Sequence, residues 1–275
     1  MGPALIVRKE SGEILYDTSK SVYGLVKSGP VEYHGIWRKL HPAGGPSPYY
    51  DNIYKFTVEN CVNPIVYVTG TCGKPFASKE GTSSVFYFAG PVEGIKVYCF
   101  DVMAPIFKGP ALKTRDENGG FTFNSLQRPL NIIGTSTPPP PSPPYPNGRV
   151  APFLGGYQVL VLDQPLLPSR AGFRGYFYTV PLNPAKTYAA NIPWSRGCWL
   201  ASQLGRDEVW QTGSQEGCSG DTGSITHSFW TSPETTHGTV HSTTPTGWFS
   251  LTVNPRPQCT YIDVSEYPYP FNPQQ

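Results

Sequence analysis

The chain has 275 residues, with 21 Lys and Arg against 19 Asp and Glu, so its formal net charge is +2. A net charge this small attracts neither nucleic acid nor an anionic membrane strongly, so neither partner is expected. Charged residues are only 15% of the chain, whereas Gly, Pro, Tyr and Phe number 29, 31, 17 and 14. This composition favours strands and turns over charged helices, and an all-β fold is expected.

The first predicted element, residues 2–18, is repeated without a gap at residues 109–125. In both copies two extended segments flank a turn, Ser11-Gly12 or Asn118-Gly119, where glycine supplies the positive φ of a hairpin. The shared residues are Gly2/Gly109, Pro3/Pro110, Ala4/Ala111, Leu5/Leu112, Arg8/Arg115, Glu10/Glu117 and Gly12/Gly119. The repeat therefore predicts two related β-hairpins.

Each hairpin is expected to bury one face, because apolar residues alternate with polar ones along it. Thr122 is assigned to the opposite, solvent-facing side together with the arginines. The residues expected on the buried face are Leu5, Val7, Ile14 and Tyr16 in the first copy, and Leu112, Phe121 and Phe123 in the second.

After the first hairpin, short segments rich in Val, Ile, Tyr and Phe follow one another, each bounded by Gly, Pro or Asn. With a hairpin near each end, residues 1–134 are predicted to form an antiparallel β-sandwich-like domain. The segments expected to be strands are 50–60, 63–71, 83–90 and 94–103.

A proline-rich stretch, residues 135–149, is expected to be a linker, because consecutive prolines remove backbone donors and favour polyproline II. A second, Trp-rich β-domain is expected at 150–265, so the predicted architecture is two sandwich-like domains joined by this linker. Residues 266–275 alternate Pro with aromatics and are expected to be an extended C-terminal tail. The tail is either free or docked on a neighbour.

Six cysteines occur without a C-x-x-C pair, which argues against a zinc knuckle or a redox motif. Free thiols are expected, although a disulfide between Cys61 and Cys72 or between Cys198 and Cys218 stays open. The chain starts without a basic and then apolar leader, so no signal peptide is expected. No apolar run approaches the ~18 residues of a membrane helix, so no membrane insertion is expected.

The stretch Asp221-Thr222-Gly223-Ser224 spells the nucleophile motif of aspartic proteases. Those enzymes need two such carboxylates, and the motif here follows Gly and Ser where an apolar strand is required, so a flexible loop is expected. His237 and His241 have helical metal-ligand spacing, but the residues between them are poor helix formers. No catalytic residue, metal or cofactor is expected.

Five of the six tryptophans lie in the second region. Exposed tryptophans dominate protein interfaces and pack on apolar sugar faces, whereas most tryptophans of a β-domain lie in its core. The candidates for receptor or partner contact are Trp199, Trp210, Trp230 and Trp248.

The hairpin motif, with the preceding KVYCFDVM (96–103) and the following RPLNIIG (128–134), resembles β-rich tail-tip and baseplate-associated proteins of long-tailed bacteriophages and prophages. The resemblance covers about residues 1–134. It implies a virion component at the distal end of the tail, made in the bacterial host cytoplasm and structural or receptor-contacting rather than catalytic. Its implied partners are other tail proteins, further copies in a trimer or ring, and a host receptor such as a glycan or pilus.

Two other functions remain open at this stage. A carbohydrate-binding or adhesin-like module would use surface tryptophans. A hydrolase would depend on Asp221, the aspartate of its only motif.

Overall fold

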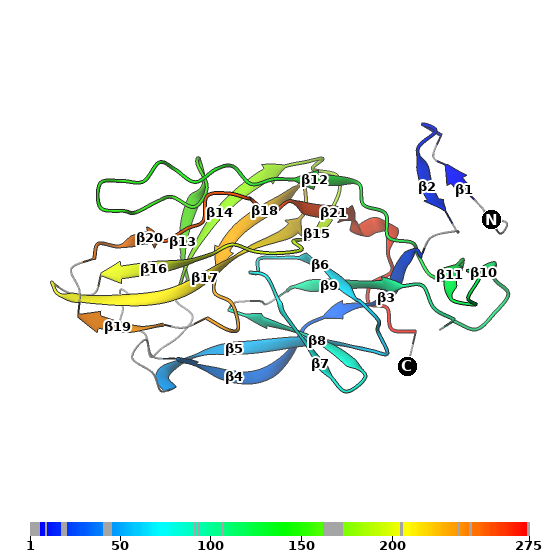
Figure 1. The fold of residues 1–275 in the computed structure, drawn as a ribbon, viewed down its shortest axis with the longest axis horizontal. Helices are drawn as coiled ribbons and strands as arrows, with labels where there is room; N and C mark the ends of the chain where they lie inside the picture. Colours follow the sequence, from blue (N-terminus) through cyan, green and yellow to red (C-terminus); the bar gives the residue numbers. More distant parts are fainter. Residues whose placement is uncertain are drawn as a thin grey trace.

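A computed structural model describes residues 6–8, 10–17, 21–40, 46–90, 92, 94–105, 107–161, 173–203, 206–235, 237–241 and 244–273. Within these residues the chain forms strands and one short 3-10 helix, η1 (Val264–Glu266), so the all-β prediction is confirmed (Figure 1). The Val, Ile, Tyr and Phe content of the strands suits half-buried pleated surfaces.

The described residues form 21 strands. The four segments predicted in the first region are strands β5, β6, β8 and β9. The bounds are β1 (Ile6–Arg8), β2 (Ile14–Asp17), β3 (Tyr23–Pro30), β4 (Glu32–Leu40), β5 (Pro46–Glu59), β6 (Ile65–Thr69), β7 (Phe76–Glu80), β8 (Ser83–Ala89), β9 (Lys96–Val102), β10 (Lys113–Arg115), β11 (Phe121–Asn124), β12 (Gly134–Ser136), β13 (Tyr157–Val161), β14 (Phe173–Pro181), β15 (Tyr188–Asn191), β16 (Gly197–Gln203), β17 (Glu208–Asp221), β18 (Ser224–Trp230), β19 (His237–His241), β20 (Gly247–Phe249) and β21 (Cys259–Asp263).

The main sheet has 13 strands and runs through both predicted domains. Its central order is β12-β21-β15-β6-β17-β18-β14-β13, with β9 and β3 joined through β6, and β16, β19 and β20 joined through β17. Strand β6 of the first region pairs with β15 at Val68↔Ala190 and with β17 at Thr69↔Gly220. The predicted division into two sandwich domains is therefore not confirmed.

Gly220 shows why strands β15 and β17 of the second region can lie so close together. A Cβ atom at this position would lie 2.0 Å from the carbonyl oxygen of Tyr188. Only glycine leaves room for β15 beside β17 at this crossing.

One core cluster also joins the two regions. Leu25, Tyr67, Tyr98 and Phe100 of the first region pack with Ala189, Ile262 and Tyr267 of the second. Burial of this shared apolar surface stabilises the contact between the two regions, as expected for a common core.

The proline-rich stretch lies against the second region instead of bridging two bodies. Thr135 and Ser136 belong to β12, which pairs with β21. Farther along, the Arg256 guanidinium donates to the Pro138 carbonyl at 2.6 Å, and the Leu154 amide donates to the Pro140 carbonyl at 2.8 Å. Because its carbonyls are used within the chain, the stretch is not confirmed as a linker.

The C-terminal tail docks on the chain's own β3. Ser28 and Phe271 exchange two backbone hydrogen bonds of 2.8 Å, and the Ser28 hydroxyl donates to the Pro268 carbonyl at 2.6 Å. The chain therefore ends beside one of its first long strands (Figure 1).

A second sheet has four strands in the order β4-β5-β8-β7. Lys39 of β4 forms a buried ion pair with Asp51 of β5 and donates to the hydroxyls of Thr231 and Thr235, which follow β18. Burial lowers the pKa of Lys39, and the Asp51 carboxylate opposes that shift. These contacts tie the small sheet to the segment that follows β18.

The two repeats form separate hairpins, β1–β2 and β10–β11, with matching ladders. The register shifts between Val7 and Arg8 in one and between Thr114 and Arg115 in the other. Gly12 and Gly119 have φ of +86° and +83°, so the glycines adopt the left-handed conformation that the turns require. The predicted pair of related hairpins is confirmed.

Candidate functional site

The tryptophans predicted to contact a receptor lie mainly in the core. Trp210, Trp230 and Trp248 are 2%, 1% and 2% exposed, because they fill the inner faces of the strands they occupy. Trp199 is half-buried, stacks on Phe249 with ring centroids 4.6 Å apart and donates to the Ser250 hydroxyl. In this conformation only Trp199 of the four retains substantial surface for a ligand.

The glycine and serine residues expected to form a flexible loop at 217–223 are instead a strand and a tight turn. Residues 217–221 belong to β17, which pairs with β18 from Asp221↔Ser224 to Gln215↔Trp230. The prediction of a flexible loop was wrong, because small residues fit here where strands cross closely: a Cβ on Gly217 would lie 2.7 Å from the Lys74 amide nitrogen. The turn leaves Asp221 exposed at the strand end.

Asp221 belongs to a groove of about 490 Å³ on strands β13, β14, β17 and β18. The Tyr157 ring, 51% exposed, lies beside the buried Phe177 with centroids 5.9 Å apart. Three hydroxyls follow one another across the strands: Tyr157 Oη lies 3.2 Å from Thr179 Oγ1, which lies 3.1 Å from Thr226 Oγ1. The groove thus combines an aromatic face with a row of hydroxyls and a carboxylate.

A second candidate surface is the β1–β2 hairpin. Its apolar residues Ile6 and Ile14 are 48% and 52% exposed, although Ile14 was predicted to be buried. Figure 1 shows this hairpin standing away from the sheets. Of its other expected core residues, Val7 is half-buried, whereas Leu5 and the side chain of Tyr16 lie outside the described residues.

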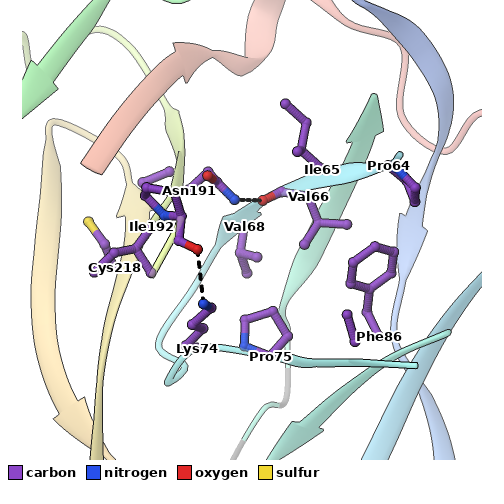
Figure 2. Close-up of a pocket in the computed structure, with 13 residues that line it drawn as sticks. Pro64, Ile65, Val66, Val68, Lys74, Pro75, Phe86, Asn191, Ile192 and Cys218 are labelled. Atoms are coloured by element: carbon purple, nitrogen blue, oxygen red, sulfur yellow. Dashed lines mark hydrogen bonds between the residues drawn. The ribbon is translucent and has the colours of Figure 1, made fainter. Parts of the chain in front are cut away.

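An apolar cavity of about 280 Å³ is lined by residues of the paired strands β6 and β15 together with Lys74, Pro75 and Phe86 (Figure 2). The Asn191 side-chain amide donates to the Val66 carbonyl at 2.8 Å, and the Lys74 ammonium donates to the Pro193 carbonyl at 3.1 Å. Burial lowers the pKa of Lys74. Both donors are thus bonded to backbone carbonyls of the cavity wall, so they connect the segments that form it.

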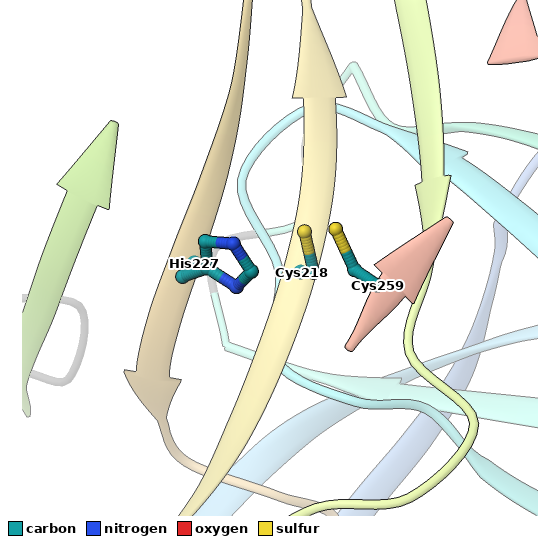
Figure 3. A group of neighbouring side chains, drawn as sticks. All are labelled: Cys218, His227 and Cys259. Carbon is teal, nitrogen blue, oxygen red and sulfur yellow. The ribbon is translucent and has the colours of Figure 1, made fainter. Parts of the chain in front are cut away.

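Three buried side chains could hold a metal ion: Cys218, His227 and Cys259 (Figure 3). One ligand atom from each lies within 4.8 Å of the other two. The strands explain the grouping, because Cys218 and His227 are directly paired across β17 and β18, while Cys259 comes from β21. Hydrogen bonding with Cys218 lowers the pKa of Cys259, and burial raises the pKa of Cys218.

The sequence itself contains a signal for part of this group. A tight turn at Thr222-Gly223 places residues at equal distances from it side by side, which pairs Cys218 with His227. Cys259 carries no such signal, because its position depends on distant pairings of β21. The two histidines with helical metal-ligand spacing, His237 and His241, lie on strand β19, and their side chains are outside the described residues.

In the part of the chain that the structure describes, no helix is both long enough and apolar enough to cross a membrane. No family model matches the chain, and no curated protein or solved structure is significantly similar to it. Function is therefore argued from this chain's own residues.

Proposed function

We propose that the chain is a non-enzymatic structural component of a bacteriophage tail tip, contributing to tail-tip assembly and host attachment. Its partners would be other tail proteins and further copies of itself in a trimer or ring, at the distal end of the virion. The motif resemblance in residues 1–134 motivates the proposal, and the exposed β1–β2 hairpin is the observation that supports it best.

The hairpin supports an assembly role because a two-stranded hairpin alone is marginally stable in water. Its repeat, β10–β11, buries Phe123 and Asn124 against the rest of the chain, whereas β1–β2 exposes Ile6 and Ile14. Exposed apolar side chains on an open sheet edge suit addition to a neighbouring protein. A tail subunit would use such a hairpin to contact the next subunit.

The experiment is to express the tagged chain in a host producing the phage whose genome encodes it, and to purify the intact particles. We expect the chain to co-purify with particles, and immunogold labelling to mark the distal end of the tail. The double variant Ile6→Glu/Ile14→Glu should fold normally and lose incorporation, because each glutamate would place a charge in the subunit interface.

The matched control is Val62→Glu, which changes another strongly exposed apolar residue outside the hairpin. It should be incorporated like the wild-type chain. Labelling at the head, absence from particles, or equal incorporation of both variants would refute the proposal.

A second candidate function is glycan binding, favoured by the groove around Tyr157. An aromatic face packs on the apolar face of a sugar, and hydroxyls with a carboxylate bind its hydroxyl groups. This alternative then depends on Tyr157, Thr179 and Asp221, which line the groove together with the buried Trp230.

A glycan and lipopolysaccharide array would test this alternative. Binding should fall at least about tenfold in Tyr157→Ala, an estimate based on the loss of one interface aromatic. Trp199→Ala serves as the control outside the groove and should bind as wild type. Equal binding by Tyr157→Ala and the wild-type chain would exclude the groove.

A further inference from the structure

We propose that Cys218, His227 and Cys259 form a zinc-binding site. Each residue comes from a different strand, β17, β18 or β21, and all three are buried. The site is independent of the groove, of the β1–β2 hairpin and of the proposed tail function.

The spacing of the ligand atoms fits one small ion. Zinc binds thiolate sulfur at about 2.3 Å and imidazole nitrogen at about 2.0 Å, so tetrahedral sulfur ligands lie about 3.8 Å apart. The three ligand atoms here are within 4.8 Å of one another, so a contraction of about 1 Å at most would bring them to that separation.

The histidine provides a second, separate argument. His227 is fully buried, and its Nδ1 atom has no hydrogen-bond partner, while Nε2 lies 3.0 Å from the Ser136 hydroxyl oxygen. A buried polar atom without a partner destabilises the fold, and a metal ion bound by the imidazole removes that deficit. Ser136 is then placed to hold the ring nitrogen that does not bind the ion, as outer partners of zinc-bound histidines do.

The charge of the two thiolates and the type of the three ligands both favour zinc over calcium or magnesium. Two thiolates neutralise a divalent ion, so the buried group carries no net charge. Thiolate and imidazole together are ligands that zinc prefers, whereas calcium and magnesium require oxygen. Three protein ligands leave the fourth position to a water molecule.

The ion would connect segments that are distant in the sequence. Cys218 and His227 flank one turn, whereas Cys259 lies on β21 directly opposite Ser136 at the start of the proline-rich stretch. Zinc would thus fasten this stretch and β21 to the β17–β18 hairpin. Because the ion binds the folded chain, it should raise the unfolding temperature.

The test uses the full chain, purified under reducing conditions and without chelator, and then made metal-free. We expect inductively coupled plasma mass spectrometry to find one zinc per chain before metal removal. Titration with zinc chloride alone should restore one equivalent and raise the unfolding temperature. Cobalt chloride should produce the charge-transfer absorption of thiolate-bound cobalt.

Two variants and one control sharpen the test. Cys259→Ser removes a ligand and should abolish stoichiometric binding, while Ser136→Ala keeps all three ligands and should weaken zinc affinity about 10- to 100-fold. Cys61→Ser changes a half-buried thiol outside the group and should bind zinc as wild type. If Cys259→Ser fails to fold, the wild-type stoichiometry and the cobalt spectrum decide the question.

Three results would overturn the proposal. The first is a wild-type chain that takes up no stoichiometric zinc. The second is a folded Cys259→Ser variant with wild-type affinity. The third is a disulfide between Cys218 and Cys259 in the freshly reduced and purified chain, detected by peptide mass mapping.

Discussion

The hairpins β1–β2 and β10–β11 have the same ladder, the same register shift and the same glycine turn, yet they differ in burial. At matched positions, Phe121 of the second hairpin is half-buried whereas Ile14 of the first is 52% exposed, and Asn124 is fully buried whereas Asp17 is half-buried. A local sequence pattern therefore specifies the hairpin, and the neighbouring chain decides whether its faces are covered.

The covering of β10–β11 comes from residues just before β3 and just after β9. The Val22 amide donates to the Thr122 carbonyl at 3.1 Å, and the Asn124 side-chain amide donates to the Ala104 carbonyl at 2.9 Å. The prediction that Thr122 faces solvent was wrong, because its face of the hairpin is covered and its hydroxyl bonds with Thr114 at 2.8 Å.

The largest difference between the hairpins should come from their apolar residues. Phe123→Ala should lower the free energy of unfolding by about 4 kcal/mol, because it leaves a cavity where the ring is buried. Ile14→Ala should change it by less than about 0.5 kcal/mol, because that side chain is exposed. Urea denaturation of both variants measures the contrast, and equal effects would show that β10–β11 unfolds apart from the core.

A smaller contrast is expected at the matched positions Asn124 and Asp17. Asn124→Asp should cost about 2 to 3 kcal/mol near neutral pH, because it removes the donor to the Ala104 carbonyl and buries a charge. Burial raises the pKa of the new carboxyl group, so the loss is present above that pKa. The loss should shrink as the pH falls and the carboxyl becomes protonated.

The reverse exchange, Asp17→Asn, is the control, since residue 17 is only half-buried. We expect a smaller loss than in Asn124→Asp, because water still solvates a half-buried side chain. Denaturation curves at neutral and mildly acidic pH measure both exchanges. A pH-independent loss in Asn124→Asp would contradict the assigned burial.

The smallest expected contrast concerns the turn glycines. An added Cβ at Gly12 or Gly119 meets no atom within 4 Å, so alanine strains only the backbone. Gly119→Ala should lower the free energy of unfolding by about 1 kcal/mol. Gly12→Ala should strain its own turn equally but leave global unfolding unchanged, and amide hydrogen exchange should detect the local loss in β1–β2. Equal global losses would show that β1–β2 is part of the cooperative core.

The sequence was sufficient to predict the all-β class, the repeated hairpins and strands such as β6, β8 and β9, because alternation and turn residues act within a few neighbours. It failed for short strands such as β12 and β15. These segments have too few residues to show an alternation, and they are extended because they pair with β21.

Tertiary structure alone decided which surfaces meet. The pairing of β6 with β15 and β17 joined the two predicted regions in one sheet, and the position of β21 brought Cys259 to Cys218 and His227. The same packing buried Trp230 and left Tyr157 at the groove. Local patterns fix the shape of each ribbon, whereas long-range pairing and burial, which depend on the whole chain, determine where its side chains can act.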